Sequence, residues 1–271
     1  ILSTRRIETR SDRLVTIAVL PMMSCAGRLP IYMMFVSALF PSRLQAPVLF
    51  GIYASGVLLA LCCARLLKNT LFKAPQRDSL HHMKRLRLPS LRKVGILMWS
   101  RAFMYVRKAG TFILGASIIL WFLNTYPRPE EDTAPTNAAA MEHSYAGQIG
   151  HWMEPVTQVA GFDWKINSAL VGAFAAKEIF VTQMGILYAV EDGNSAPAAQ
   201  QTLNARLKAS YTPLQGISIM IFCLIALPCI GTVTVAKREA GTWWFALAQF
   251  GGLTLLGFAT ATLIYQAGLL L

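Results

Sequence analysis

The chain has 271 residues, of which 55% are hydrophobic and only 14% are charged, and its formal net charge is +12. A soluble domain usually carries about 25% charged residues, so this composition excludes an ordinary soluble protein and indicates an integral membrane protein. The basic residues flank apolar stretches and no nucleic-acid module is recognisable, so the charge predicts cytoplasmic membrane loops rather than binding of nucleic acid.

Apolar residues gather in about six segments, each close to the roughly 20 residues that a membrane-spanning helix needs. In chain order these segments cover residues 14–40, 46–64, 109–126, 166–190, 214–235 and 243–271. We therefore predict an all-α fold, a polytopic integral membrane helical bundle. The interruptions described below predict broken or re-entrant gate helices within that bundle.

The first segment, residues 14–40, is interrupted around Pro21 and Pro30, and Cys25 lies between the two prolines. Proline in a helix interior removes a backbone hydrogen bond. In lipid such a break is tolerated only where protein or a water-lined cavity satisfies the freed backbone groups. Arg28 lies in the same segment and needs a partner, because intramembrane charges are costly. We predict that Pro21, Ser24, Arg28 and Pro30 shape a gate.

A strongly basic stretch, residues 65–108, follows the second segment and contains a single acid, Asp78. The positive-inside rule places this stretch in the cytoplasm. Its second part mixes basic with apolar and aromatic residues. That pattern fits a helix on the inner membrane surface, or one that leads into the third segment, and it fits a helix packed beneath the bundle equally well. Residues 1–126 are the first predicted unit, a gate half that contains Cys25.

Residues 127–165 are predominantly acidic, which predicts an extracytoplasmic loop. The fourth segment, residues 166–190, then contains an intramembrane charge pair, Lys177 and Glu178. These side chains could form a salt bridge that locks the segment, or pair with other intramembrane groups. If the segment spans the membrane, the basic Lys237 and Arg238 lie outside. If it enters and returns, they lie inside, where basic residues fit better, so we favour this re-entrant arrangement.

The fifth segment, residues 214–235, contains Pro228, Cys229 and Gly231, a faint echo of the Pro, Cys and Gly residues of the first segment. Transporters are often built from repeats whose broken helices meet near the midplane of the membrane. Residues 166–271 are the second predicted unit, a gate half that contains Cys229 and that Pro228 and Gly231 are predicted to shape. Cys62, Cys63 and Cys223 are best interpreted as small apolar residues that fill space.

The residue types at the breaks favour a soft metal ion. The apolar segments offer a single carboxylate, Glu178, so a magnesium or calcium cage is excluded as a main interpretation. Thiolates select softer ions such as iron(II), zinc and copper(I). We predict Cys25 and Cys229 as metal contacts and Glu178 as a further candidate contact. No nucleotide loop and no catalytic residue set is present, so we do not expect an enzyme.

Three ordered stretches carry a family resemblance. They are DRLVTIAVLPMMSCAGRLPIY at 12–32, RLPSLRKVGILMWSRAFMYVRKAGTFIL at 87–114 with GFDWKINSALVGAFAAKEIFV at 161–181, and LPCIGTVTVAKREAGTWWFALAQ at 227–249. Together they resemble the membrane part of the ferrous iron transport protein B family. The first and third stretches are similar to the two gate motifs of that family.

This resemblance implies transport of ferrous iron (Fe²⁺) across a bacterial inner membrane, with Cys25 and Cys229 in the gates. It also implies an N-terminal cytoplasmic GTP-binding domain outside this chain, so that GTP would bind only through that domain and no cofactor would be held tightly here. Small accessory proteins are the further partners it implies, and a homo-oligomer stays open. Three alternatives remain: transport of another divalent metal, transport of a small organic solute, and a membrane scaffold that docks a cytoplasmic partner.

Overall fold

The computed structural model describes residues 4, 7, 9–23, 25–70, 90–127, 142–188 and 196–270. For some of these only the backbone is described, namely residues 101, 104, 105, 108, 109, 112, 113 and 196–201. Ser24, residues 71–89 of the basic stretch and residues 128–141 of the predicted outer loop lie outside the described residues. The described residues form helices and no strand, which confirms the all-α prediction.

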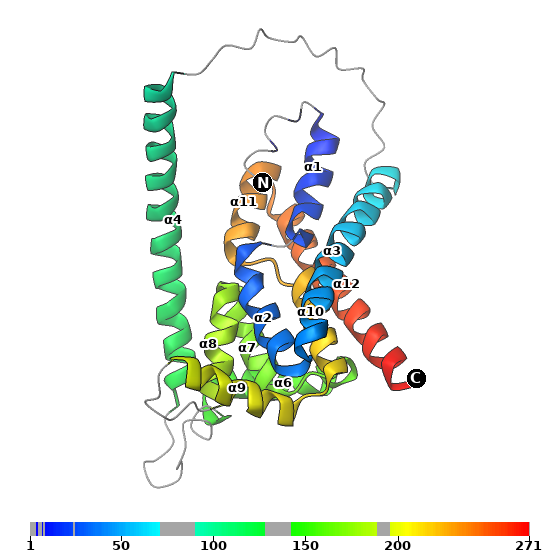
Figure 1. Ribbon diagram of the computed structural model, residues 1–271. Helices are drawn as coiled ribbons and strands as arrows, with labels where there is room; N and C mark the ends of the chain where they lie inside the picture. Colours follow the sequence, from blue (N-terminus) through cyan, green and yellow to red (C-terminus); the bar gives the residue numbers. More distant parts are fainter. Residues whose placement is uncertain are drawn as a thin grey trace.

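The helices are shown in Figure 1. In chain order they are α1 (Arg10–Val19), η2 (Leu20–Met22), η3 (Ala26–Arg28), α2 (Leu29–Leu39), α3 (Ser42–Thr70), α4 (Leu91–Thr125), α6 (Tyr145–Thr157), η4 (Gln158–Ala160), α7 (Trp164–Ala175), α8 (Lys177–Leu187), α9 (Ala196–Ser210), α10 (Pro213–Ile225), α11 (Ile230–Ala240) and α12 (Trp243–Leu270).

Four stretches among the described residues are long and apolar enough to cross a membrane, and they match four of the predicted segments. They are Arg10–Leu39, Ser42–Thr70, Pro213–Ala240 and Trp243–Leu270. The first and third are each built from two helices with a break between them. The chain is therefore a multi-pass membrane protein whose bundle contains broken helices.

The predicted segment at 109–126 forms the C-terminal part of α4, where the apolar stretch Leu114–Thr125 lies. Because α4 is one continuous helix of 35 residues, the second part of the basic stretch leads directly into this segment. It does not form a separate helix beneath the bundle. The N-terminal half of α4 stands apart from the other helices in Figure 1.

The predicted segment at 166–190 forms a helical hairpin, α7 and α8. Gln183 of α8 donates a hydrogen bond to the Ser168 hydroxyl of α7, at 3.4 Å. Nearer the turn, a Cβ added at Gly172 would lie 3.1 Å from Ile179. At about 1.5 Å per residue, the helices of 12 and 11 residues extend about 18 Å and about 17 Å, well short of the roughly 30 Å core of a bilayer. The hairpin therefore has the geometry expected of a re-entrant segment.

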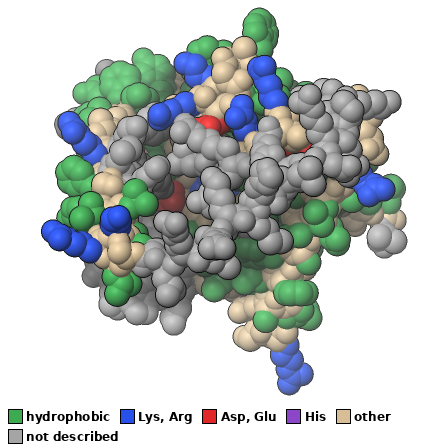
Figure 2. Space-filling model, turned by 90° about the horizontal axis from the view of Figure 1, so that it is seen from above, with side chains coloured by type: hydrophobic (Ala, Val, Ile, Leu, Met, Phe, Trp, Pro, Cys, Tyr) green, Lys and Arg blue, Asp and Glu red, His purple; other side chains and the backbone are tan. Residues whose placement is uncertain are grey.

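Because the hairpin turns back, α10–α11 runs upward in Figure 1 and its basic C-terminal turn reaches the same end as the N-terminus of α4. Figure 2 looks down on this end and shows Lys and Arg side chains around it. The positive-inside rule assigns this end to the cytoplasm. The helix ends found here carry these basic residues: Arg10, Arg13, Arg65, Lys68, Arg92, Lys93, Lys237 and Arg238.

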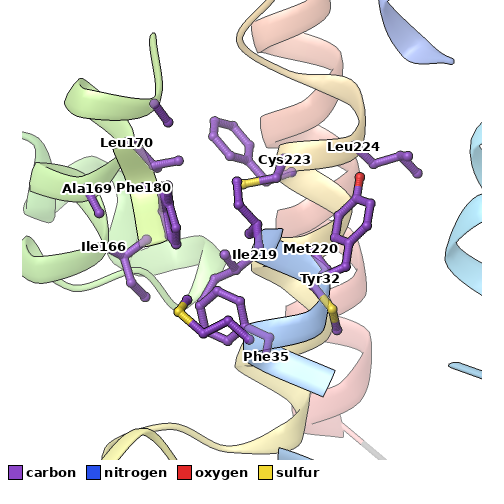
Figure 3. Close-up of a cluster of buried hydrophobic side chains, with 14 of the residues drawn as sticks. Tyr32, Phe35, Ile166, Ala169, Leu170, Phe180, Ile219, Met220, Cys223 and Leu224 are labelled. Atoms are coloured by element: carbon purple, nitrogen blue, oxygen red, sulfur yellow. The ribbon is translucent and has the colours of Figure 1, made fainter. Parts of the chain in front are cut away.

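A buried apolar cluster holds α2, α7, α8 and α10 together around the lower half of the bundle. Figure 3 shows Phe35 of α2, Phe180 of α8 and Ile219 of α10 converging there, and each is fully buried. The rings of Phe35 and Phe180 lie 6.1 Å apart, centroid to centroid. Leucine- and phenylalanine-sized side chains buried in this way each contribute about 1.5–3 kcal/mol, so the cluster fixes the hairpin against the two broken spans.

A labelling experiment tests the direction of the hairpin. We expect Gln148→Cys on α6 to react with a membrane-impermeant maleimide in intact cells, because α6 lies at the end opposite the basic residues. Arg238→Cys and Ser90→Cys should react only after permeabilisation, above the background of the parent chain. Labelling of Arg238→Cys from outside intact cells would show that residues 166–190 cross the membrane.

A pair of glycines on α12 tests the packing behind the second break. A Cβ at Gly257 would lie 2.7 Å from the Cβ of Ala226, whereas a Cβ at Gly252 meets nothing within 4 Å. We expect Gly257→Ala to lower the free energy of unfolding by about 1–3 kcal/mol, the usual cost of overpacking. Gly252→Ala should be neutral or slightly stabilising, because alanine favours helix over glycine. Thermal unfolding in detergent measures both, and equal melting temperatures would contradict the close approach.

Candidate gate at the meeting point of three helix breaks

Three helix breaks lie at a similar height midway through the bundle, between α1 and α2, between α7 and α8, and between α10 and α11 (Figure 1). The first begins where α1 ends at Val19. Pro21 then lies in the short helix η2, and the backbone of Cys25 is extended before η3 begins. Pro30 occupies the first turn of α2, where a missing N–H is harmless, so it starts a helix rather than interrupting one.

The second break covers residues 226–229. Helix α10 ends at Ile225, Leu227 adopts a left-handed backbone with φ of 53°, and Cys229 is the extended residue that precedes α11. A non-glycine residue in this region costs about 1–2 kcal/mol, and such strain persists only where the surrounding structure imposes it. Cys229 is half-buried, and its Sγ lies 3.2 Å from the Thr232 hydroxyl.

Lys177 at the tip of the hairpin reaches the second break. Its side chain is buried, and its Nζ donates hydrogen bonds to the carbonyls of Ala226, at 3.1 Å, and Cys223, at 3.4 Å. These carbonyls lie where α10 ends, so they have lost the donors that a continuing helix would supply. A lysine at a helix C-terminus satisfies them and opposes the negative end of the helix dipole.

Glu178 turns toward the first break instead. Its carboxylate lies against Gly27, so closely that a Cβ at Gly27 would be 2.6 Å from Oε1. The predicted charge pair is therefore directed at two different partners: Lys177 at the end of α10 and Glu178 at η3. This divergence follows from helix geometry, since adjacent residues on a helix do not face each other. The hairpin tip thus touches both broken spans.

Both predicted thiols lie near the same buried charge. The Lys177 ammonium interacts electrostatically with Cys25, Cys223, Cys229 and Arg28, which come from the two broken spans. Cys25 is exposed, whereas Cys223 is fully buried and points into the apolar cluster (Figure 3). Arg28 is only 2% exposed, and its Nε and Nη1 have no hydrogen-bond partner within the part of the chain that the structure describes.

The first break also has a polar side chain that caps its carbonyls, and the sequence analysis did not identify it. Gln249 of α12 is buried and donates to the carbonyls of Ile17, at 2.8 Å, and Ala18, at 3.3 Å. In a continuous helix the Ile17 carbonyl would accept from residue 21, but that residue is Pro21 and has no N–H. The sequence does show Gln249 as a polar residue within an apolar segment. Only the fold shows that Gln249 contacts the first break, at a residue 232 positions away.

Polar contacts at the lower end hold the hairpin in place. Asp163 caps α7 by accepting from the Ile166 N–H at 2.9 Å, and it also accepts from the Tyr211 hydroxyl at 2.9 Å. Burial raises the pKa of the Asp163 carboxyl. Asn124 of α4 and Gln183 of α8 exchange two amide hydrogen bonds of 2.9 Å. These hydrogen bonds fix the two ends of the hairpin that lie away from its tip, and so they fix the position of the tip that carries Lys177.

No preformed metal centre is present among the described residues, since no group of three or more His, Cys, Asp or Glu side chains could hold a metal ion. A cavity of about 1200 Å³ lies between α4, α7 and α11, and Ala175 and Ile230 line it beside the breaks. Its lining is apolar apart from Ser100, Arg107 and Thr111, so it does not suit a metal cation. The predicted contacts Cys25, Glu178 and Cys229 lie instead at or beside the three breaks.

Two family profiles match the chain. The first, described as "Gate: Nucleoside recognition", covers residues 106–243, which is half of the chain. The second, described as "Ferrous iron transport protein B C terminus", covers residues 49–101. The first profile covers the C-terminal part of α4, the hairpin and the second broken span. The second covers most of α3 and the N-terminal part of α4. No solved structure matches the chain.

Several curated relatives are Fe(2+) transporters by name. The Fe(2+) transporter FeoB of Campylobacter jejuni is 35% identical over 92% of this chain and 41% of its own length. The corresponding transporter of Methanocaldococcus jannaschii is 34% identical over 100% of this chain and 39% of its own length. A fusion of Fe(2+) transport protein A with FeoB in Porphyromonas gingivalis is 34% identical over 100% of this chain and 36% of its own length. The chain thus spans less than half the length of these relatives, and it belongs to the ferrous iron transport protein B family, as the C-terminal part of its membrane region.

Proposed function

We propose that this chain forms part of a ferrous iron permease, in which Fe²⁺ passes between the two broken spans and contacts the thiols of Cys25 and Cys229. One observation carries the proposal: thiols from two helix breaks, far apart in sequence, both lie near the buried ammonium of Lys177. The names of the relatives support iron as the cargo. The proposed location is a bacterial inner membrane.

The chemistry of the breaks supports transit rather than storage. Thiolates favour soft and borderline cations, and backbone carbonyls freed at a break can replace part of the hydration shell of an ion. A closed cage of four thiolates would hold a metal too tightly for transport. Two thiols, with the Glu178 carboxylate beside Gly27 as a third contact, form an incomplete and therefore weaker site. Arg28, Pro21, Pro228 and Gly231 would shape the gate around it.

The profile name "Nucleoside recognition" keeps one alternative in view, a transporter of an organic solute. Such a site would need aromatic and polar side chains that converge on the ligand. The groups near Lys177 are instead the carbonyls at the end of α10, three cysteines and Arg28. A metal cation fits this set better, and the choice of iron over manganese or zinc rests on the relatives.

The proposed partners are suggested by the relatives, which are more than twice as long as this chain. We propose that the full-length protein also contains a GTP-binding domain that acts on this membrane region and is the only site for GTP. The Porphyromonas gingivalis relative joins Fe(2+) transport protein A to FeoB in one chain. That fusion supports a small accessory protein as a partner here. A scaffold function without ion flux is the remaining alternative, and flux measurements separate it from transport.

Cysteine substitutions test the thiol path. We expect Cys25→Ser and Cys229→Ser each to lower Fe²⁺ uptake by the full-length protein at least about tenfold, because a hydroxyl is a far poorer ligand than a thiolate for this ion. Cys62→Ser is the matched control, since Cys62 is exposed on α3 away from the breaks, and it should leave uptake unchanged. Unchanged uptake in both gate variants would exclude the thiols from the path.

Substitution of the intramembrane carboxylate tests the third contact. Glu178→Gln retains the shape of the side chain but removes its charge, so we expect weaker Fe²⁺ binding, seen as a raised KM for uptake in vesicles. Glu142→Gln is the control, because Glu142 is an exposed acid next to α6, outside the three breaks, where it contacts His151. If both variants keep the parent KM, Glu178 acts on neither binding nor entry.

A further inference from the structure

The end of α10 presents backbone carbonyls to the middle of the membrane, and a positive charge already lies on them. Lys177 Nζ is 3.1 Å from the Ala226 oxygen and 3.4 Å from the Cys223 oxygen. The lysine comes from a separate element, the tip of the hairpin, and its side chain is only 4% exposed. The contact therefore joins a hairpin that does not span the membrane to a broken helix that does.

Carbonyls in this position have the properties of a cation site. They lie at the negative end of the α10 dipole, and Leu227 turns the chain away, so no further helical N–H competes for them. In transporters, unwound backbone carbonyls and half-helix C-termini coordinate the transported cation near the midplane. Cys229, a proposed iron contact, follows Ala226 by three residues, so the carbonyls lie next to the proposed path.

On the basis of the proposed iron path, we infer that the Cys223 and Ala226 carbonyls form a second binding site for the transported cation, and that the Lys177 ammonium occupies this site in the closed gate. The tethered ammonium stands in for the cation. An arriving Fe²⁺ takes its place, and the hairpin tip withdraws. This mechanism assigns the re-entrant hairpin the role of a plug.

Charge at the breaks favours displacement over a permanent cap. Arg28, which is 2% exposed and has two guanidinium nitrogens without a partner among the described residues, acts on the same ammonium. Two buried cations repel each other in a low-dielectric interior. The closed arrangement therefore holds Lys177 on its carbonyls against this repulsion. Withdrawal of the hairpin relieves the repulsion and frees the oxygens at the same time.

Flux through the full-length protein in vesicles that contain an Fe²⁺ indicator tests the plug. We expect Lys177→Met to raise the nucleotide-free Fe²⁺ leak at least about tenfold, because a tenfold change corresponds to the loss of even one of the two hydrogen bonds that this charged donor makes. Lys177→Arg keeps a cation on the carbonyls and should stay close to the parent. Lys165→Met is the matched control, because Lys165 lies at the base of the hairpin, over the Tyr188 ring, and contacts no break.

A leak at or below the parent level in monodisperse, folded Lys177→Met protein would overturn the inference. A second measurement uses the unsubstituted protein and does not depend on the variant folding. A small amine-reactive reagent should modify Lys177 faster when Fe²⁺ is saturating than when it is absent, while modification of Lys165 stays constant, as read by peptide mass spectrometry. Equal modification of Lys177 in both conditions would also overturn the plug.

The two proposals fail separately in this design. If Cys25→Ser and Cys229→Ser transport iron normally while Lys177→Met leaks, the thiol path is wrong and the carbonyl site stands. If the cysteine variants lose transport while Lys177→Met remains tight, the thiol path stands and the plug is wrong.

Discussion

The structure depends on one constraint, the need to satisfy backbone groups where a membrane helix is broken. In lipid an unsatisfied carbonyl costs several kcal/mol, so a break must bring its own donor. Gln249 supplies that donor to the end of α1, and Lys177 supplies it to the end of α10. Each donor comes from a different element, so each break is tied to the rest of the bundle. The two breaks and the side chains that cap them, Gln249 and Lys177, therefore link separate helices of the bundle.

The two broken spans run in opposite directions through the bundle. The first broken span runs from the basic end toward the opposite end, and the second runs back toward it (Figure 1). Their breaks meet at a common height because the hairpin, with helices of 12 and 11 residues, reaches only partway across and inserts its tip between them. If residues 166–190 crossed the membrane once instead of turning back, the second broken span would run in the opposite direction and the meeting point would be lost.

The sequence predicted the membrane class and the position of the breaks well, because apolar length and proline chemistry are local properties. Cys25 and Cys229 were placed near breaks on that basis, and Lys177 and Glu178 were identified as an intramembrane charge pair. The partners of these residues could not be predicted in the same way. The pairing of Lys177 with the end of α10 joins residues 46 and 49 positions apart, and that of Gln249 with Ile17 joins residues 232 apart. Pro30 shows the opposite limit, since a proline in an apolar run can begin a helix as well as interrupt one.

The same arrangement explains how a closed gate can be stable and still open. A side chain that caps a helix end only for stability would best be a neutral amide, as Gln249 is at the first break, because a buried charge must be desolvated. Lysine at the second break carries that cost, and a second buried cation, Arg28, lies within range of it. In the proposed mechanism both costs fall when Fe²⁺ arrives and the hairpin tip withdraws, since the Lys177 ammonium then leaves its buried site and moves away from Arg28. In that mechanism a charge at this position couples the arrival of the cation to movement of the hairpin, which a neutral cap could not do.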